Sequence, residues 1–254
     1  MKRTFFILFS LILLFAACGH SGNNDGDEQV SGDNLSQEPV ERQLAGDSTI
    51  YGLACEGSND SIIVILTSAE SDPDTIDVLE ARINRRVFGR PDIGDQVAIL
   101  MNAERKSAAD IVINIDRLKG EWCYQVMPRL RRRVSASSDS AVQLPPDFPD
   151  SLRRKWFQPR EYGFEIRRDN TVRPIGMQRN EAERQPGPVE YPVSKRYRQW
   201  HVFNGRLLLS ETRRDTSGHQ QVISTDTADI VFMRRDTLQL RFADHEQSYY
   251  RRSN

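Results

Sequence analysis

Short β-branched runs separated by turn residues fill the chain from residue 49 to residue 115. The runs Thr49–Cys55 and Ser61–Thr67 flank Gly57-Ser58-Asn59-Asp60, and this spacing predicts a β-hairpin. Further short strands are predicted at residues 87–88, 96–101 and 110–115, and residues 77–82 fit a strand or a short helix. This rhythm predicts a small, barrel-like β module.

The clearest alternation of apolar and polar positions lies between residues 116 and 254. Asn204-Gly205 separates two apolar runs, and this pair is the strongest short signal for a hairpin because both turn positions need positive φ. Further hairpins are predicted at residues 162–177 and 227–242, and another strand begins at Trp122. These elements predict roughly eight antiparallel strands, the number whose closed barrel has room for one small ligand.

Two insertions, at residues 128–160 and 178–192, interrupt these strands. Their prolines exclude central strands, so both are expected to be loops. The basic run Arg129–Arg133 is a candidate site for anionic head groups, with a solvated loop as the alternative. Trp156 and Phe157 either plug the barrel mouth or form an exposed platform.

Gly120-Glu121-Trp122 opens the second region after an amphipathic turn. A Gly-x-Trp leading into a strand resembles the opening of lipocalin-like domains. The resemblance covers about half of the chain. It implies a closed barrel with Trp122 across its base and an arginine of the last strand packed on the indole, a role for which Arg241 is the candidate. It also implies a small apolar or amphipathic ligand inside the barrel.

The N-terminus has the layout of a secretory signal. Met1-Lys2-Arg3 is followed by the apolar run Phe5–Phe15, too short for a membrane-spanning helix, which needs ~20 residues. Ala16-Ala17-Cys18 resembles a bacterial lipobox, although Phe15 stands where leucine is usual. The resemblance implies a signal peptide at residues 1–17 and a lipid on Cys18. The alternative is an ordinary cysteine near a signal-peptidase site.

Residues 18–48 are rich in Gly, Ser, Asn, Asp and Glu and have no periodicity, which predicts a flexible acidic tether. Acidic residues after a lipidated cysteine, here beginning at Asp25, resemble the surface-export signals of Bacteroidota lipoproteins. The chain is therefore expected to be lipid-anchored at the outer membrane, on the periplasmic face or at the cell surface.

The net charge of −1 conceals two regions of opposite sign. Residues 50–116 carry twelve acidic and six basic residues, net −6, whereas residues 117–214 carry 21 basic and 11 acidic residues, net +10. Opposite fields of this kind attract the two modules to one another. The first module is similar to an OB fold, but its acidity argues against nucleic-acid binding.

The chain offers few candidates for chemistry. Cys55 and Cys123 either pair in an oxidising compartment or remain two separate thiols. The four histidines lack the spacing of a metal site, and no nucleophile elbow, phosphate loop or metalloprotease motif is present. We therefore expect no catalytic residues, no metal and no cofactor.

The predicted fold class is mainly β, with an OB-like module at residues 49–115 and a lipocalin-like antiparallel barrel at residues 116–254. The predicted function is that of a non-enzymatic, lipid-anchored envelope protein that binds a small apolar or amphipathic ligand. The alternative is a structural or interaction lipoprotein with filled barrels, whose partner is another envelope protein.

Overall fold

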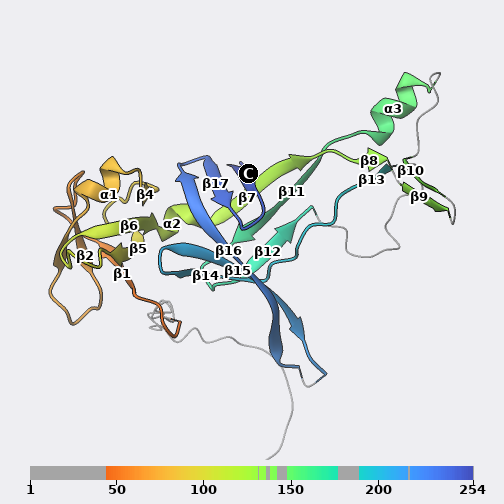
Figure 1. Cartoon of the computed structure of the whole chain (residues 1–254). Helices are drawn as coiled ribbons and strands as arrows, with labels where there is room; N and C mark the ends of the chain where they lie inside the picture. Colours follow the sequence, from red (N-terminus) through yellow and green to blue (C-terminus); the bar gives the residue numbers. More distant parts are fainter. Residues whose placement is uncertain are drawn as a thin grey trace, which may run out of the picture. The chain divides into compact units, whose positions relative to one another are not determined.

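The computed structural model describes residues 44–130, 132–135, 138–141, 148–176, 189–216 and 218–253, and side chains are not described between residues 131 and 147. Within these ranges the protein has eighteen strands and three short helices (Figure 1). The mainly β fold predicted from the sequence is confirmed. Its two large sheets contain the described core.

The N-terminal sheet has six strands in the order β3-β2-β1-β5-β6-β4. Their bounds are β1 Thr49–Ala54, β2 Ile62–Leu66, β3 Asp74–Asp77, β4 Val87–Phe88, β5 Gln96–Met101 and β6 Ala109–Asn114. Neighbouring strands are antiparallel except β4 and β6. A parallel bridge between Asp77 and Ala108 also joins the end of β3 to the start of β6. Helix α1, Leu79–Ile83, lies between β3 and β4 in the sequence, so the ambiguous segment at residues 77–82 is mostly helical.

The C-terminal sheet has eight strands in the order β12-β11-β7-β18-β17-β16-β15-β14, and it curls into an antiparallel half-barrel (Figure 1). Their bounds are β7 Gly120–Val126, β11 Arg160–Ile166, β12 Val172–Ile175, β14 Gln199–Phe203, β15 Arg206–Arg214, β16 Gln220–Met233, β17 Thr237–Arg241 and β18 Glu246–Arg251. The edge strands meet at one end through a bridge between Thr171 and Gln199. Beside it the Val172 amide donates to the Arg198 carbonyl at 2.8 Å, and the Trp200 amide donates to the Asn170 carbonyl at 3.0 Å.

The hairpins predicted from local turn signals are present. β14 and β15 pair across Asn204-Gly205, whose φ values are 47° and 73°, as the two-residue turn requires. A Cβ on Gly205 would lie 2.7 Å from the Ile111 side chain, so this turn also packs closely on β6. β1 and β2 form the first predicted hairpin.

The two insertions contain regular structure where loops were expected. The first holds β8 Arg129–Leu130, β9 Arg132–Ser135, β10 Ser138–Ala141 and helix α3 Asp150–Trp156, and the second holds β13 Val189–Glu190. These strands pair only with one another, β8 with β13 and β9 with β10, so they lie outside the main sheet. Pro149 immediately precedes α3, where a proline costs the helix no hydrogen bond.

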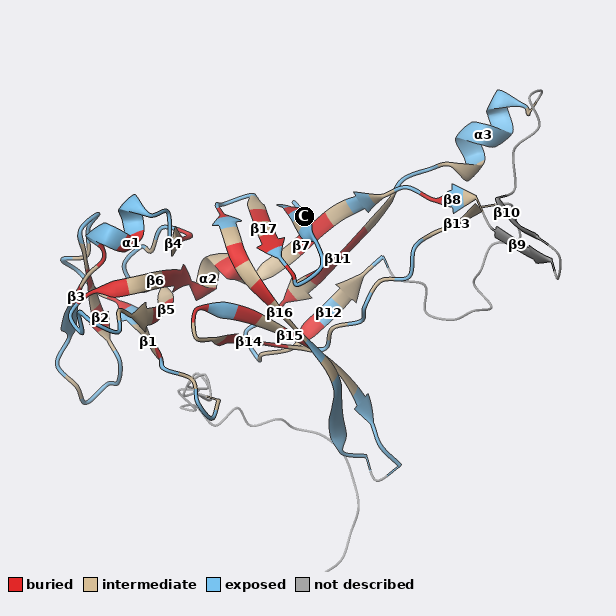
Figure 2. Cartoon of the chain, viewed as in Figure 1, coloured by how far each residue is buried: buried red, intermediate tan, exposed pale blue. Residues whose placement is uncertain are grey.

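One hydrophobic cluster runs through both large sheets. It joins Phe88, Ala98 and Ile113 of the N-terminal sheet to Trp122, Trp200 and the inward residues of the half-barrel, and a second cluster fills the rest of the N-terminal sheet. Figure 2 shows buried residues along the inner strands of both sheets and exposed residues along α1, α3 and the far end of the β15–β16 hairpin. The two predicted regions therefore share a core.

Asp47 links the N-terminal sheet to the β14–β15 turn by hydrogen bonds. Its Oδ1 accepts from the Thr49 amide at 3.0 Å, the Thr49 hydroxyl at 2.6 Å and the Asn204 amide at 2.9 Å. The Tyr51 hydroxyl lies 2.8 Å from both Asp47 Oδ2 and the Val202 carbonyl. Burial opposes the charge of Asp47, but these hydrogen bonds outweigh it and lower its pKa. The carboxylate thus holds two segments that are distant in sequence.

Trp122 lies near the start of β7 with an arginine on its face, but the arginine is Arg251 and not Arg241. The indole is fully buried and donates to the Leu118 carbonyl at 2.7 Å. The Arg251 guanidinium lies 4.2 Å from the ring centroid. Arg241 instead pairs with Glu246 at 2.5 Å on the surface. The assignment to Arg241 was wrong because the last strand is β18, which the sequence analysis did not identify.

Arg251 also satisfies backbone carbonyls at the end of helix α2, Ile115–Leu118, and in the turn between β16 and β17. Its guanidinium donates to the carbonyls of Lys119 at 2.8 Å and Arg235 at 2.6 Å, and to that of Arg117. Gly120, with φ of 124°, lies so close that an added Cβ would overlap the guanidinium. The glycine of the Gly-x-Trp motif therefore makes room for the arginine that covers the tryptophan.

We predict that Arg251→Met lowers the free energy of unfolding by about 1–3 kcal/mol, because it removes a cation–π contact and leaves two half-buried carbonyls, those of Arg117 and Lys119, without this donor. Arg241→Met is the matched control and should change stability little, since its partner is an exposed carboxylate. Urea unfolding followed by tryptophan fluorescence measures both. Equal losses for the two variants would contradict the assignment of Arg251.

Candidate functional site

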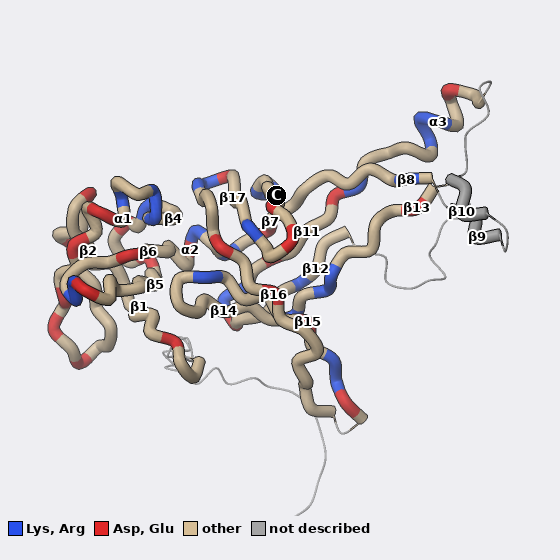
Figure 3. Tube along the Cα trace, in the orientation of Figure 1, with Lys and Arg blue, Asp and Glu red and all other residues tan. Residues whose placement is uncertain are grey.

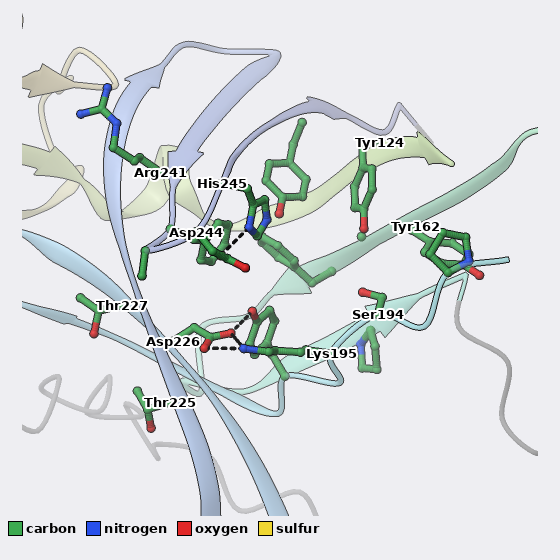
Figure 4. Close-up of a pocket in the computed structure, with 18 of the residues that line it drawn as sticks. Tyr124, Tyr162, Ser194, Lys195, Thr225, Asp226, Thr227, Arg241, Asp244 and His245 are labelled. Atoms are coloured by element: carbon green, nitrogen blue, oxygen red, sulfur yellow. Dashed lines mark hydrogen bonds and ion pairs between the residues drawn. The ribbon is translucent and has the colours of Figure 1, made fainter. Parts of the chain in front are cut away.

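A cavity of about 750 Å³, partly open to solvent, lies on the concave side of the half-barrel (Figure 4). Its lining comes from β7, β11, β12, β15, β16, β17 and β18, from the turn between β17 and β18, and from the segment that precedes β14. These segments are distant in sequence, and the curl of the sheet brings them to one hollow. The volume lies within the range of roughly 300–1,000 Å³ that is usual for small-molecule sites.

Five aromatic residues form one wall of the cavity: Tyr124, Tyr162, Phe164, Tyr197 and Tyr249. Residues on one strand alternate between the two faces, so Tyr162 and Phe164 of β11 share the inner face. Tyr124 contacts Tyr249 edge-to-face at 5.4 Å and Tyr162 at 6.3 Å between ring centroids. Edge-to-face contacts are favourable for aromatic rings, so they hold the wall in place.

Three of the tyrosine hydroxyls have no hydrogen-bond partner among the described residues, namely those of Tyr124, Tyr162 and Tyr249. Burial raises the pKa of Tyr162, and burial together with Tyr124 raises that of Tyr249. Both therefore stay protonated at neutral pH. The aromatic wall thus presents hydroxyl groups that are free to bond to a ligand.

Asp226 of β16 accepts several side-chain hydrogen bonds within the cavity (Figure 4). Its two oxygens accept from Lys195 Nζ, each at 2.6 Å, and the Tyr197 hydroxyl donates to Oδ2 at 2.5 Å. Burial opposes ionisation, but these hydrogen bonds outweigh it and lower the pKa of Asp226. The same contact, together with burial, raises the pKa of Tyr197. Asp226 is therefore charged at neutral pH and its lysine partner is on the exposed rim.

The remaining charges of the lining are also paired. Arg206 meets Asp229 at 2.6 Å, and Arg241 meets Glu246. Asp244 lies 2.7 Å from the His245 ring, and this contact lowers the pKa of Asp244. Lys195, Arg206 and Arg241 equal Asp226, Asp229 and Asp244 in number, so the formal charges of these six lining residues cancel.

The two regions of opposite net charge in the sequence remain distinct in the folded protein. Acidic residues recur around the N-terminal sheet, and lysines and arginines recur along the C-terminal sheet and its insertions (Figure 3). The residues that join the two sheets, however, are the apolar cluster and the Asp47 network. Among the charged pairs, Arg117–Asp92 at 2.8 Å connects the two predicted regions.

The structure places the two cysteines in different sheets as free thiols. Cys55 follows β1, whereas Cys123 is buried in β7 opposite Gly163 and Tyr250. The disulfide considered from the sequence is not formed. Burial, followed by the charge of Glu161, raises the pKa of the Cys123 thiol to about 11. Cys18 and residues 1–43 lie outside the described part of the chain.

The other candidates do not reach the cavity. Arg129 pairs with Glu190 at 3.1 Å, and the side chains of Arg131, Arg132 and Arg133 lie outside the described residues. Trp156, the last residue of α3, packs against Phe148 with 5.0 Å between the ring centroids, and neither Trp156 nor Phe157 lines the cavity. The expected barrel plug is therefore wrong.

The cavity residues could not be identified from the sequence because they are far apart in the chain and come together only in the folded protein. Lys195 and Asp226 are 31 residues apart, and Tyr249 lies on the unrecognised strand β18. One signal was available: the alternation Tyr162, Phe164, Ile166 marks an aromatic inner face.

No family model, curated protein or solved structure matches this chain. Within the described ranges, no helix is both long and apolar enough to span a membrane. The same residues contain no group of three or more His, Cys, Asp and Glu side chains placed to hold a metal ion.

We predict that iodoacetamide modifies Cys55 in the folded protein at neutral pH but leaves Cys123 untouched. The thiolate is the form that reacts with iodoacetamide. Cys123 is buried, and its pKa of about 11 keeps the thiol protonated at neutral pH. Mass spectrometry of tryptic peptides measures both sites, and unfolding in urea, where both should react, is the control. A Cys55–Cys123 cross-linked peptide in a non-reducing digest would contradict the prediction.

Proposed function

We propose that this protein is a non-enzymatic, lipid-anchored protein of the bacterial outer membrane that binds a small amphipathic ligand in its half-barrel. The observation that carries the binding role is the cavity of about 750 Å³ with an aromatic wall on one side and paired charges on the other. Apolar pockets with a few polar groups are the usual form of small-molecule sites.

The half-barrel is lipocalin-like in this proposal. Three features support it: eight antiparallel strands around one hollow, edge strands that meet at Thr171 and Gln199, and a buried tryptophan with an arginine on its face at the base. The first feature fits a barrel whose interior holds one ligand.

The N-terminal sheet is OB-like in this proposal. A meander of β1, β2 and β3, a helix, and the hairpin β5–β6 follow one another. The parallel bridge from β3 to the start of β6 links the two ends of the sheet. Its role is to support the half-barrel, because Phe88, Ala98 and Ile113 of this sheet belong to the shared hydrophobic cluster.

A binding role fits the cavity better than catalysis. Asp226 has a lowered pKa and is held by Lys195 and Tyr197, so it is a weak base. Burial raises the pKa of Tyr249, which makes it a poor proton donor near neutral pH. The lining residues thus suit recognition by hydrogen bonds and ring contacts.

We expect N-phenyl-1-naphthylamine, a fluorescent apolar amine, to bind once per chain with a saturable rise in fluorescence. Ser194→Trp fills the cavity mouth and should weaken binding at least ~10-fold, which corresponds to ~1.4 kcal/mol. Ser248→Trp is the matched control because Ser248 lies on the opposite side of β18 from Tyr249. Unsaturable fluorescence, or equal loss in both variants, would reject a cavity ligand.

The lipid anchor is tested separately, and its support is the Ala16-Ala17-Cys18 sequence. We expect Cys18→Ala to release the protein from the membrane pellet, while Cys55→Ala leaves it there. Fractionation followed by immunoblotting measures the distribution. Membrane association retained by Cys18→Ala would contradict the lipid attachment.

A second candidate is an envelope protein–protein interaction through the β15–β16 hairpin, which extends past the half-barrel (Figure 2). Val222 and Ile223 on its outer part are 53% and 51% exposed. A two-stranded ribbon is only marginally stable by itself, so a partner strand would stabilise it. This candidate is preferred if the cavity binds no amphiphile.

A further inference from the structure

The charges, hydrogen-bonding groups and ring orientations of the cavity lining indicate which class of ligand the cavity accepts. We infer that the ligand's polar end is a neutral, hydroxyl-rich ring, that is, a saccharide. This inference rests on the proposed function, because it specifies the class of molecule that occupies the same cavity. Three independent properties of the lining support it.

The first property is the balance of charge. The three basic and three acidic side chains of the lining cancel in formal charge. Lys195 pairs with Asp226, Arg206 with Asp229 and Arg241 with the neighbouring Glu246, and Asp244 has a hydrogen-bond contact with His245. A cationic head would have to displace Lys195 from Asp226, and an anionic head would have to displace Asp226 from Lys195. A neutral head avoids either loss, because it can bond to these groups without separating them.

The second property is the supply of hydrogen-bonding groups. The hydroxyls of Tyr124, Tyr162 and Tyr249 have no partner among the described residues and face the hollow as donors or acceptors. The carboxylates of Asp226 and Asp244 are acceptors on the same lining. A sugar hydroxyl both donates and accepts, so a ring carrying several of them satisfies both kinds of group at once.

The third property is the shape of the aromatic wall. The rings of Tyr124 and Tyr249 are perpendicular, at 90°, and those of Phe164 and Tyr197 make an angle of 80°. Perpendicular rings present both edges and faces to the hollow. A saccharide ring has an apolar C–H face and polar hydroxyl edges, so it can lie against an aromatic face while its hydroxyls reach the tyrosine oxygens.

The test compares four compounds with the same octyl chain: octyl glucoside, octyltrimethylammonium, octyl sulfate and octanol. Each is titrated, below its micelle concentration, by calorimetry into the full mature chain carrying Cys18→Ser. We expect octyl glucoside to bind at least tenfold more tightly than either charged compound and than octanol.

Two conservative variants connect the preference to the cavity. Asp226→Asn should reduce octyl glucoside affinity about tenfold, as expected for loss of a charged hydrogen-bond acceptor, and leave octanol unchanged. Tyr249→Phe keeps the ring but removes its hydroxyl, and should also weaken glucoside binding. The controls are Asp72→Asn, on an exposed loop, and Tyr250→Phe, on the opposite face of the same strand.

Each outcome is decisive. Equal affinity for all four compounds overturns the saccharide inference and leaves the proposed binding of amphiphiles standing. Tighter binding of octyltrimethylammonium or octyl sulfate overturns it in favour of a charged head. Binding of none of the four rejects both the inference and the proposed function.

Discussion

The guanidinium of Arg251 on the indole of Trp122 is the contact on which the C-terminal sheet most depends. It joins the last strand, β18, to β7, the first strand of the half-barrel, and to the carbonyls around α2. Without it, the base of the half-barrel would contain a buried indole face and several unpaired carbonyls. The geometry of the cavity follows, because Tyr124 and Tyr249 lie on these same two strands.

Much of the fold could be predicted from local patterns. Asn204-Gly205 specifies its turn because both residues adopt positive φ, and the β-branched runs of the N-terminal sheet have strong preferences of their own. Strand β18 was missed because Glu246-Gln-Ser-Tyr-Tyr-Arg251 has one buried residue, Tyr249, and lacks an apolar alternation. Because this strand was missed, Arg241 was predicted to pack on Trp122 in place of Arg251.

The cavity could not be predicted for a different reason. Tyr124, Tyr162 and Tyr249 occupy ordinary inward positions on three strands, and only the register of those strands brings the rings together. The bond between Lys195 and Asp226 likewise depends on how β16 faces the segment before β14. Turn residues determine which consecutive strands pair in a hairpin, whereas a binding site of this kind depends on contacts between segments distant in sequence.

The carboxylate of Asp47 has a mechanical consequence when the chain is pulled from its N-terminal side. It stands two residues before β1 and bonds to the Asn204 amide in the other sheet. Tension arriving from the N-terminal side would load these bonds before it reached β1, and the force would divide between both sheets. Such a pull would thus strain the hydrogen bonds between the two sheets before it separated β1 from its neighbours.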